Sequence, residues 1–177
     1  MKEPGLILVL VVVLTSVSGR GAETASLSPL ADTCLWEFDP DYNFGAQTEI
    51  PAGTLGSLGD GARSRALFKF DIASKIPANA VITSAQLQVT VVRSPSGRNS
   101  STFAMHRVLR EWNEGMKSGD LPGGRAATAG ESTWNARLEG ESAWGEPGGE
   151  FGVDFDPNVS ATAAVSGNRD YVFTLNA

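Results

Sequence analysis

The residues of this chain with the clearest binding chemistry are aromatic rings that stand next to amides. Trp112-Asn113 and Trp134-Asn135 each join an indole ring to an amide, and Trp144 precedes a glycine in a predicted loop. An aromatic ring offers a flat apolar face to the C–H face of a pyranose, and amides bond to its hydroxyls. These five residues are therefore candidate carbohydrate contacts. The alternative is that the tryptophans seal the edge of a hydrophobic core.

Three basic side chains are predicted to lie on one face of a strand. Arg63, Arg65 and Lys69 occupy odd positions, which share a face because side chains alternate along a strand. A guanidinium binds a carboxylate through two parallel hydrogen bonds, so the group suits uronic-acid polymers such as alginate or pectin. The alternative is that these are solvated residues paired with nearby acids such as Asp71.

An acidic loop offers oxygen ligands for a hard cation. Asp39, Asp41 and Asn43 alternate along this loop and are candidate ligands of a structural calcium ion. Aspartate, asparagine, proline and glycine are also the residues that turns prefer, and the loop contains all four. Turn chemistry without a metal is therefore the alternative, and the one that the composition favours.

The residues needed for catalysis are scarce. His106 is the only histidine, so any Ser-His-Asp or Cys-His arrangement would depend on it. The chain has no Gly-x-Ser-x-Gly elbow and no Gly-x-x-x-x-Gly-Lys phosphate loop. Nothing in the sequence selects a pair of acids for glycoside hydrolysis. We therefore predict a protein that is not an enzyme, with His106 as a hydrogen-bonded strand residue.

The elements that position these residues are predicted to be strands. Apolar residues alternate with polar ones from Leu67 to Ile72 and again from Ser84 to Val91, which is the period of a half-buried strand. The two segments are predicted to be adjacent antiparallel strands, with Phe68 and Phe70 facing the core. No window shows helical periodicity, and 20 glycines and 9 prolines interrupt the chain. The fold class is predicted as an all-β, antiparallel β-sandwich.

The first residues have the layout of a secretory signal peptide. Lys2 precedes an apolar run from Leu6 to Leu14, followed by small polar residues. The run is shorter than the about 20 apolar residues that a membrane span needs. Residues 1–19 are predicted to be the signal peptide, with cleavage after residue 22 or an uncleaved anchor as alternatives. Residues 20–30 are predicted to be a linker, and no membrane span remains after processing.

The net charge bears on the class of partner, and the cysteine content bears on how the fold is stabilised. The net charge is −6, which argues against nucleic acid, whose backbone needs a basic face. A single cysteine, Cys34, cannot form an intramolecular disulfide, so an exported chain must depend on packing. Cys34 lies in a strand-like segment and is predicted to be a small buried residue.

A series of short motifs resembles the DNRLRE domain, which is also carbohydrate-binding module family 96 and is related to disaggregatases. The motifs are Ala31-Asp32-Thr33, Asn43-Phe44-Gly45, Arg65-Ala66-Leu67-Phe68-Lys69-Phe70-Asp71, Ile76-Pro77, Ala85-Gln86-Leu87, His106-Arg107-Val108, Trp112-Asn113-Glu114-Gly115 and Thr133-Trp134-Asn135. The resemblance implies a jelly-roll β-sandwich over residues 31–177 that binds polysaccharide, often beside a catalytic or cell-surface domain of a larger protein. Such domains continue beyond the equivalent of Tyr171-Val172-Phe173, so the resemblance implies that C-terminal strands are missing here.

Together these observations predict a secreted or cell-surface, non-catalytic carbohydrate-binding module whose partner is a polysaccharide, with uronic-acid polymers as one candidate class. Two other classes remain open. One is a structural or adhesive β-sandwich module without sugar binding, and the other is a small polysaccharide-degrading enzyme.

Overall fold

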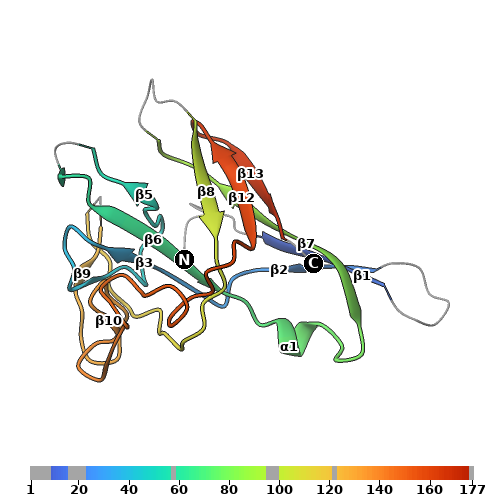
Figure 1. The fold of residues 1–177 in the computed structure, drawn as a ribbon, viewed down its shortest axis with the longest axis horizontal. Coiled ribbons are helices and arrows are strands. Elements are labelled where there is room, and N and C mark those ends of the chain that lie inside the picture. Colours follow the sequence, from blue (N-terminus) through green and yellow to red (C-terminus); the bar gives the residue numbers. More distant parts are fainter. Residues whose placement is uncertain (1–8, 16–22, 57–58, 95–99, 121–122, 176–177) are drawn as a thin grey trace. The chain divides into compact units, whose positions relative to one another are not determined.

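The computed structural model describes residues 9–15, 23–56, 59–94, 100–120 and 123–175 of the 177-residue chain (Figure 1). Within these ranges nearly every regular element is a strand. The elements are β1 (Val9–Thr15), β2 (Glu23–Leu27), β3 (Ala31–Trp36), β4 (Tyr42–Asn43), β5 (Gly53–Thr54), β6 (Arg63–Lys69), α1 (Ile72–Lys75), β7 (Val81–Thr90), β8 (Ser101–Met105), β9 (Arg125–Ala126), β10 (Ala136–Leu138), β11 (Ser142–Ala143), β12 (Ala161–Val165) and β13 (Asp170–Thr174).

Contacts divide the chain into two compact units. The first unit comprises Met1–Leu30, Lys69–Met105 and Val159–Ala177, and the second comprises Ala31–Phe68 and His106–Asn158. The predicted domain over residues 31–177 is thus composed of two groups of strands, and the first group also includes residues that precede it.

The first unit is built on a four-stranded antiparallel sheet with the order β13-β7-β1-β2. A second antiparallel pair joins β12 to β8. The buried apolar residues of this unit include Leu27, Leu87, Tyr171 and Phe173, which come from three strands of the larger sheet. This unit therefore has an apolar core of its own.

The second unit contains short antiparallel sheets and two groups of buried side chains. Its sheets are β3-β6-β5, β4-β9 and β10-β11. One buried group, which we call the tryptophan core, consists of Leu35, Leu67, Trp112, Trp134 and Trp144. In the other group, Trp36 stacks on Phe44 at 5.5 Å between ring centroids, next to Cys34.

The all-β, antiparallel prediction is confirmed, and the jelly-roll connectivity stays a prediction. The predicted pairing of the two alternating segments is wrong, because β6 pairs with β3 and β5 whereas β7 pairs with β1 and β13. The predicted core face of β6 is also wrong. Leu67 is the buried residue, since it packs against the tryptophans, while Phe68 and Phe70 are only half-buried.

Three segments contain structure that the sequence pattern did not reveal. Residues 72–75 form the one-turn helix α1, where the Asp71 carboxylate accepts a hydrogen bond from the Ser74 N–H. A single turn is too short to show helical periodicity. The predicted linker contains strand β2, and the predicted signal peptide contains strand β1, with its other residues outside those described. No helix in the described ranges is both long and apolar enough to cross a membrane.

Cys34 is predicted to be inert in the folded protein. Its side chain is fully buried, and burial raises the pKa of the thiol far above its ordinary value. Since the thiolate is the reactive form, a thiol reagent such as DTNB at pH 8 should leave the native protein unmodified and should label it fully in denaturant. Rapid labelling of the native protein would contradict the packing described for β3.

Candidate functional site

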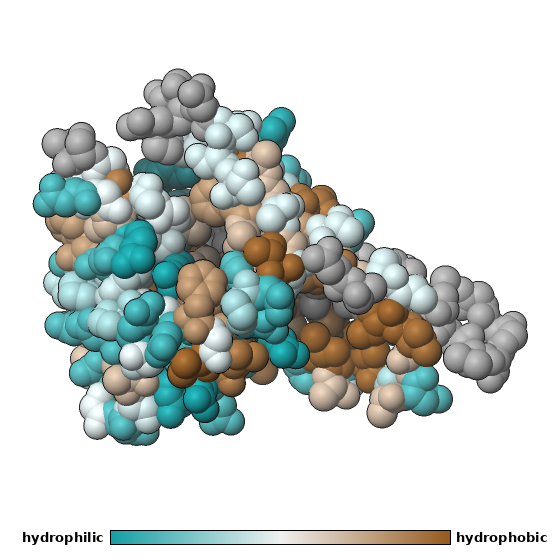
Figure 2. All heavy atoms as spheres, viewed as in Figure 1, coloured by the Kyte–Doolittle hydropathy of each residue, from teal (hydrophilic) through white to brown (hydrophobic). Residues whose placement is uncertain are grey.

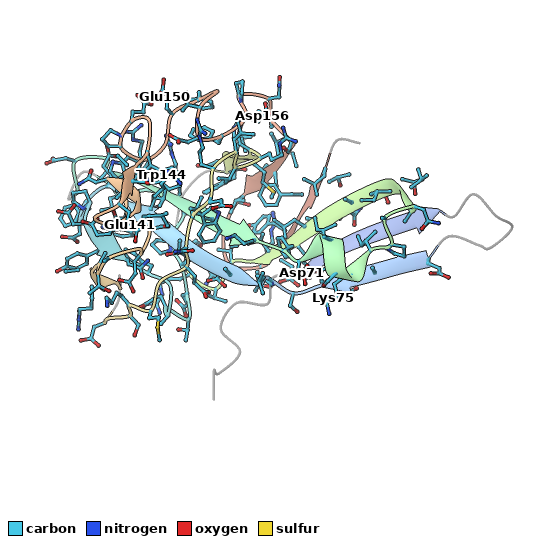
Figure 3. The ribbon with its side chains drawn as sticks, turned by 90° about the horizontal axis from the view of Figure 1, so that it is seen from below. Asp71, Lys75, Glu141, Trp144, Glu150 and Asp156 are labelled. Atoms are coloured by element: carbon cyan, nitrogen blue, oxygen red, sulfur yellow. The ribbon has the colours of Figure 1, made fainter. Side chains whose placement is uncertain are left out.

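The three tryptophans expected to contact sugar are core residues. Trp112, Trp134 and Trp144 are only 3%, 3% and 6% exposed. The indole N–H of Trp144, which Figure 3 labels, donates to the Thr133 carbonyl over 2.9 Å and so has a partner inside the protein. A ring covered on both sides has no face left for a pyranose. The predicted sugar contacts at these rings are therefore corrected to the core alternative.

The basic residues of β6 make internal contacts. Arg63 forms a two-pronged ion pair with Glu37, at 2.9 Å from Nε and 2.8 Å from Nη2, and this pair lowers the pKa of Glu37 to about 2. Arg65 donates to the carbonyls of Gly148 and Gly149, and burial lowers its pKa. Lys69 belongs to the first unit, whereas the two arginines belong to the second. The predicted basic strip is therefore not a single surface within either unit.

The two candidate asparagines bond to neighbouring loops. The Asn113 amide donates to the Gly130 carbonyl over 3.0 Å, and the Asn135 amide donates to an Asp41 carboxylate oxygen over 2.8 Å. Both residues are exposed, but each has its amide N–H directed to protein. Their contacts are those of residues that connect loops.

Two of the three candidate calcium ligands, Asp41 and Asn43, do not fit a cation, and the backbone carbonyl of the third, Asp39, accepts a hydrogen bond from the Tyr42 N–H. Asn43 is fully buried, and its Oδ1 already accepts hydrogen bonds from the Gly45 and Lys117 N–H groups. Asp41 is exposed and binds Asn135 instead. An oxygen that accepts two N–H groups has no lone pair free for a metal. Among the residues that the structure describes, no group of three or more His, Cys, Asp or Glu side chains could hold a metal ion either.

An exposed aromatic cluster in the second unit is the surface best suited to a ligand. We call it the Phe151 cluster, and it consists of the rings of His106, Phe151 and Phe155. The centroids of Phe151 and Phe155 lie 4.4 Å apart, and His106 meets them edge-on at 5.5 Å and 5.8 Å. Phe151 is 55% exposed although it touches both partners. One ring thus stays open to solvent on an aromatic base.

A buried carboxylate holds the loop that presents Phe151. Asp154 is 2% exposed, and its Oδ2 accepts hydrogen bonds from the N–H groups of Gly145 and Glu150 at 2.7 and 2.8 Å. The Gly152 N–H donates to the Phe155 carbonyl, and Gly152 has a φ of 78°, a left-handed conformation that glycine adopts without strain. These bonds close the loop tightly around Phe151.

Polar groups border the Phe151 cluster. Arg107 is 73% exposed and forms an ion pair with Asp156 at 3.4 Å. Hydrogen bonds from the Asn158 backbone and amide lower the pKa of the Asp156 carboxyl. The ring Nδ1 of His106 lies 2.9 Å from the Asp156 carbonyl. Because a carbonyl only accepts, Nδ1 carries the proton, and in the neutral ring Nε2 is an acceptor. Figure 3 shows Glu150 and Asp156 along the same margin of this unit.

Arg65 connects the cluster to the tryptophan core. Its guanidinium carbon lies 5.1 Å from the centroid of the Phe155 ring and 5.4 Å from that of Trp134. Both distances are within the range of a cation–π contact. The side chain predicted to bind a sugar carboxylate instead supports the base of the aromatic cluster.

The sequence contained a signal for Phe151 that the strand pattern obscured. The segment Phe151–Phe155 has alternating apolar residues, as a strand would, but the structure gives it only isolated bridges. An aromatic residue between Gly148-Gly149 and Gly152 is more typical of a loop that displays a ring. Hydropathy on the surface is mixed, as Figure 2 shows with hydrophobic residues among hydrophilic ones, so composition alone does not identify this position.

Comparisons of the chain with other proteins add nothing to this geometry. No protein-family model matches it, and no curated protein or solved structure is similar to it. The candidate site therefore depends on the contacts described above.

Replacing Asn43 should destabilise the second unit strongly. Asn43→Asp keeps the size but turns a carboxylate oxygen toward the carbonyls of Glu114 and Ser132, which now accept from its Nδ2 at 2.8 and 2.9 Å. We expect a loss of about 2–4 kcal/mol in the free energy of unfolding, measured by urea denaturation.

The matched control is Asp41→Asn. It removes the charge of an exposed side chain that lies two residues before Asn43. It should change stability by about 0.5 kcal/mol or less. If instead calcium raised the melting temperature and Asp41→Asn abolished that effect, the metal assignment would be restored.

Proposed function

We propose that this protein is a non-catalytic carbohydrate-binding module that contacts polysaccharide through the Phe151 cluster. The observation that supports this most directly is the 55% exposure of a phenyl ring seated on two other rings. Folding normally removes such a ring from water, yet the Asp154-bonded loop holds it outward. An exposed flat ring in a fixed orientation suits the apolar face of a sugar.

One cation at the border, Arg107, offers a contact for an acidic polymer. Arg107 is largely exposed and has one carboxylate partner, so its remaining N–H groups can meet a sugar carboxylate or hydroxyl. The proposal therefore keeps uronic-acid polymers as one candidate class of ligand. It moves the contact from the tryptophans and Arg63 to Phe151 and Arg107.

Three further features belong to the same proposal. The apolar N-terminal run supports export, and a secreted or cell-surface protein would meet polysaccharide there. The resemblance of the sequence motifs to a carbohydrate-binding family supports the same ligand class. The absence of catalysis is supported by His106, whose Nδ1 is committed to a backbone carbonyl and whose ring packs against two phenyl rings.

Phe151→Ala should weaken polysaccharide binding without unfolding the protein. Covering half of a phenyl ring contributes about 1 kcal/mol to the binding free energy. We therefore expect Phe151→Ala to lower the affinity about five- to tenfold. Affinity electrophoresis in gels containing alginate, pectin or a neutral polymer measures the effect. Phe38→Ala is the matched control, because Phe38 is also 55% exposed and lies in the same unit.

The charge contribution is tested separately. Arg107→Ala should weaken binding to alginate or pectin and leave binding to a neutral polymer unchanged. Retardation that is equal for wild type, Phe151→Ala and Phe38→Ala would exclude this contact surface. A protein that binds no polymer but self-associates through Phe151 would be a structural or adhesive module.

A further inference from the structure

The N-terminal apolar segment occupies an interior place in a sheet. β1 lies between β7 and β2 and pairs with both in antiparallel register (Figures 1 and 3). β2 lies at the end of this sheet, and β1 is its neighbour there. The same residues 9–15 fall within the predicted signal peptide, which an exported chain loses.

A row of buried side chains shows what this place in the sheet requires. Phe173 lies opposite Leu87, Leu87 lies opposite residue 10, and residue 10 lies opposite Leu27. Directly opposite residues in antiparallel strands share a face of the sheet. Phe173, Leu87 and Leu27 are 6%, 1% and 6% exposed. An apolar residue is therefore needed in the middle of the row.

The next row is polar. Residue 11 lies opposite Gln86 and opposite Ser26, and Gln86 is exposed. A strand between β7 and β2 therefore has two different faces. One face needs apolar residues, and the other accepts polar ones. Without a strand here, the N–H and C=O groups on one edge of β7 have no ladder partner, and Leu87 and Leu27 lose the residue between them.

We propose that the edge of β7 next to β1 is a strand-acceptor site, and that β2, whose only sheet partner among the described strands is β1, pairs with the far side of the strand that fills it. In the full-length chain its own residues 9–15 fill the site. Once export removes residues 1–19, the site takes an extended apolar strand, antiparallel to β7, from another polypeptide. Main-chain hydrogen bonds give such a strand its affinity, and the residue opposite Leu87 gives it specificity. The proposal rests on the export that is part of the proposed function, and it does not depend on the carbohydrate contact, whose residues belong to the other unit.

Two substitutions in the full-length chain, made in a cytosol so that no export occurs, test whether residues 9–15 fill the site. Leu10→Lys puts a charge at the register position between Leu87 and Leu27 and should lower the melting temperature by about 5–10 °C. Val11→Lys is the matched control, because residue 11 lies in the polar row, and should change it little. Equal effects of the two substitutions would overturn the assigned register.

A labelled peptide tests acceptance of a strand from outside. The probe has the sequence of residues 9–15 flanked by lysines and carries a fluorophore. It should bind the full-length Leu10→Lys protein, whose own strand is displaced, and should bind wild type at least tenfold more weakly. A probe carrying the same Leu10→Lys change should not bind. Binding to wild type and variant alike would place the interaction elsewhere and overturn the proposal.

A cysteine pair covers the case in which Leu10→Lys does not fold. Val12 and Ala85 are register partners, so a Val12→Cys and Ala85→Cys pair should form a disulfide in the folded full-length chain. The pair Val12→Cys and Gln86→Cys is displaced by one residue and should cross-link at least tenfold more slowly. Equal rates would show that residues 9–15 do not occupy the site in this register.

Discussion

The side chain of Asn43 joins segments of the second unit that are far apart in the sequence. Its amide donates to the carbonyls of Glu114 and Ser132, and its oxygen accepts from the N–H groups of Gly45 and Lys117. All this takes place with no exposure to water. A buried amide with every group satisfied is stabilising, and one with a lost partner costs about 1–3 kcal/mol. The loops that follow β4 therefore depend on this one residue.

The same contacts explain why two glycines flank the bonded segments. A side chain on Gly45 would collide with the Glu114 carbonyl, and one on Gly115 would collide with the Asn43 amide. Gly115 also has a φ of 79°, which other residues seldom adopt. The Glu114 carboxylate in turn accepts from the Asp32 N–H. Motifs that suggested a carbohydrate-binding family in the sequence thus meet here as structural contacts, and they describe how the loops pack.

The sequence predicted the class of the fold better than its pairing. Alternation in residues 84–91 identified β7 and its buried Leu87, because one face of that strand is covered. It could not show that β6 and β7 belong to different sheets, since partner choice depends on distant residues. The predicted faces of β6 were also wrong. Leu67 packs against the buried tryptophans, and this contact buries its face of the strand instead of the face that carries the two phenylalanines.

The candidate site was harder to predict for a related reason. Residue types such as tryptophan and arginine indicate binding chemistry, but the fold decides whether they face water. Here Arg65 makes a cation–π contact with the buried Trp134, so both side chains pack against other protein groups. Phe151 is an ordinary apolar residue in the sequence and becomes distinctive only through its loop.

That loop has a consequence for how the protein can change. Asp154 closes it through backbone N–H groups, and Gly152 bonds through its own backbone, so neither bond depends on the identity of residue 151. The exposed position can therefore vary while the scaffold beneath it stays the same. Proteins with this loop could diverge in what they recognise by exchanging one residue, with little effect on the stability of the unit that carries it.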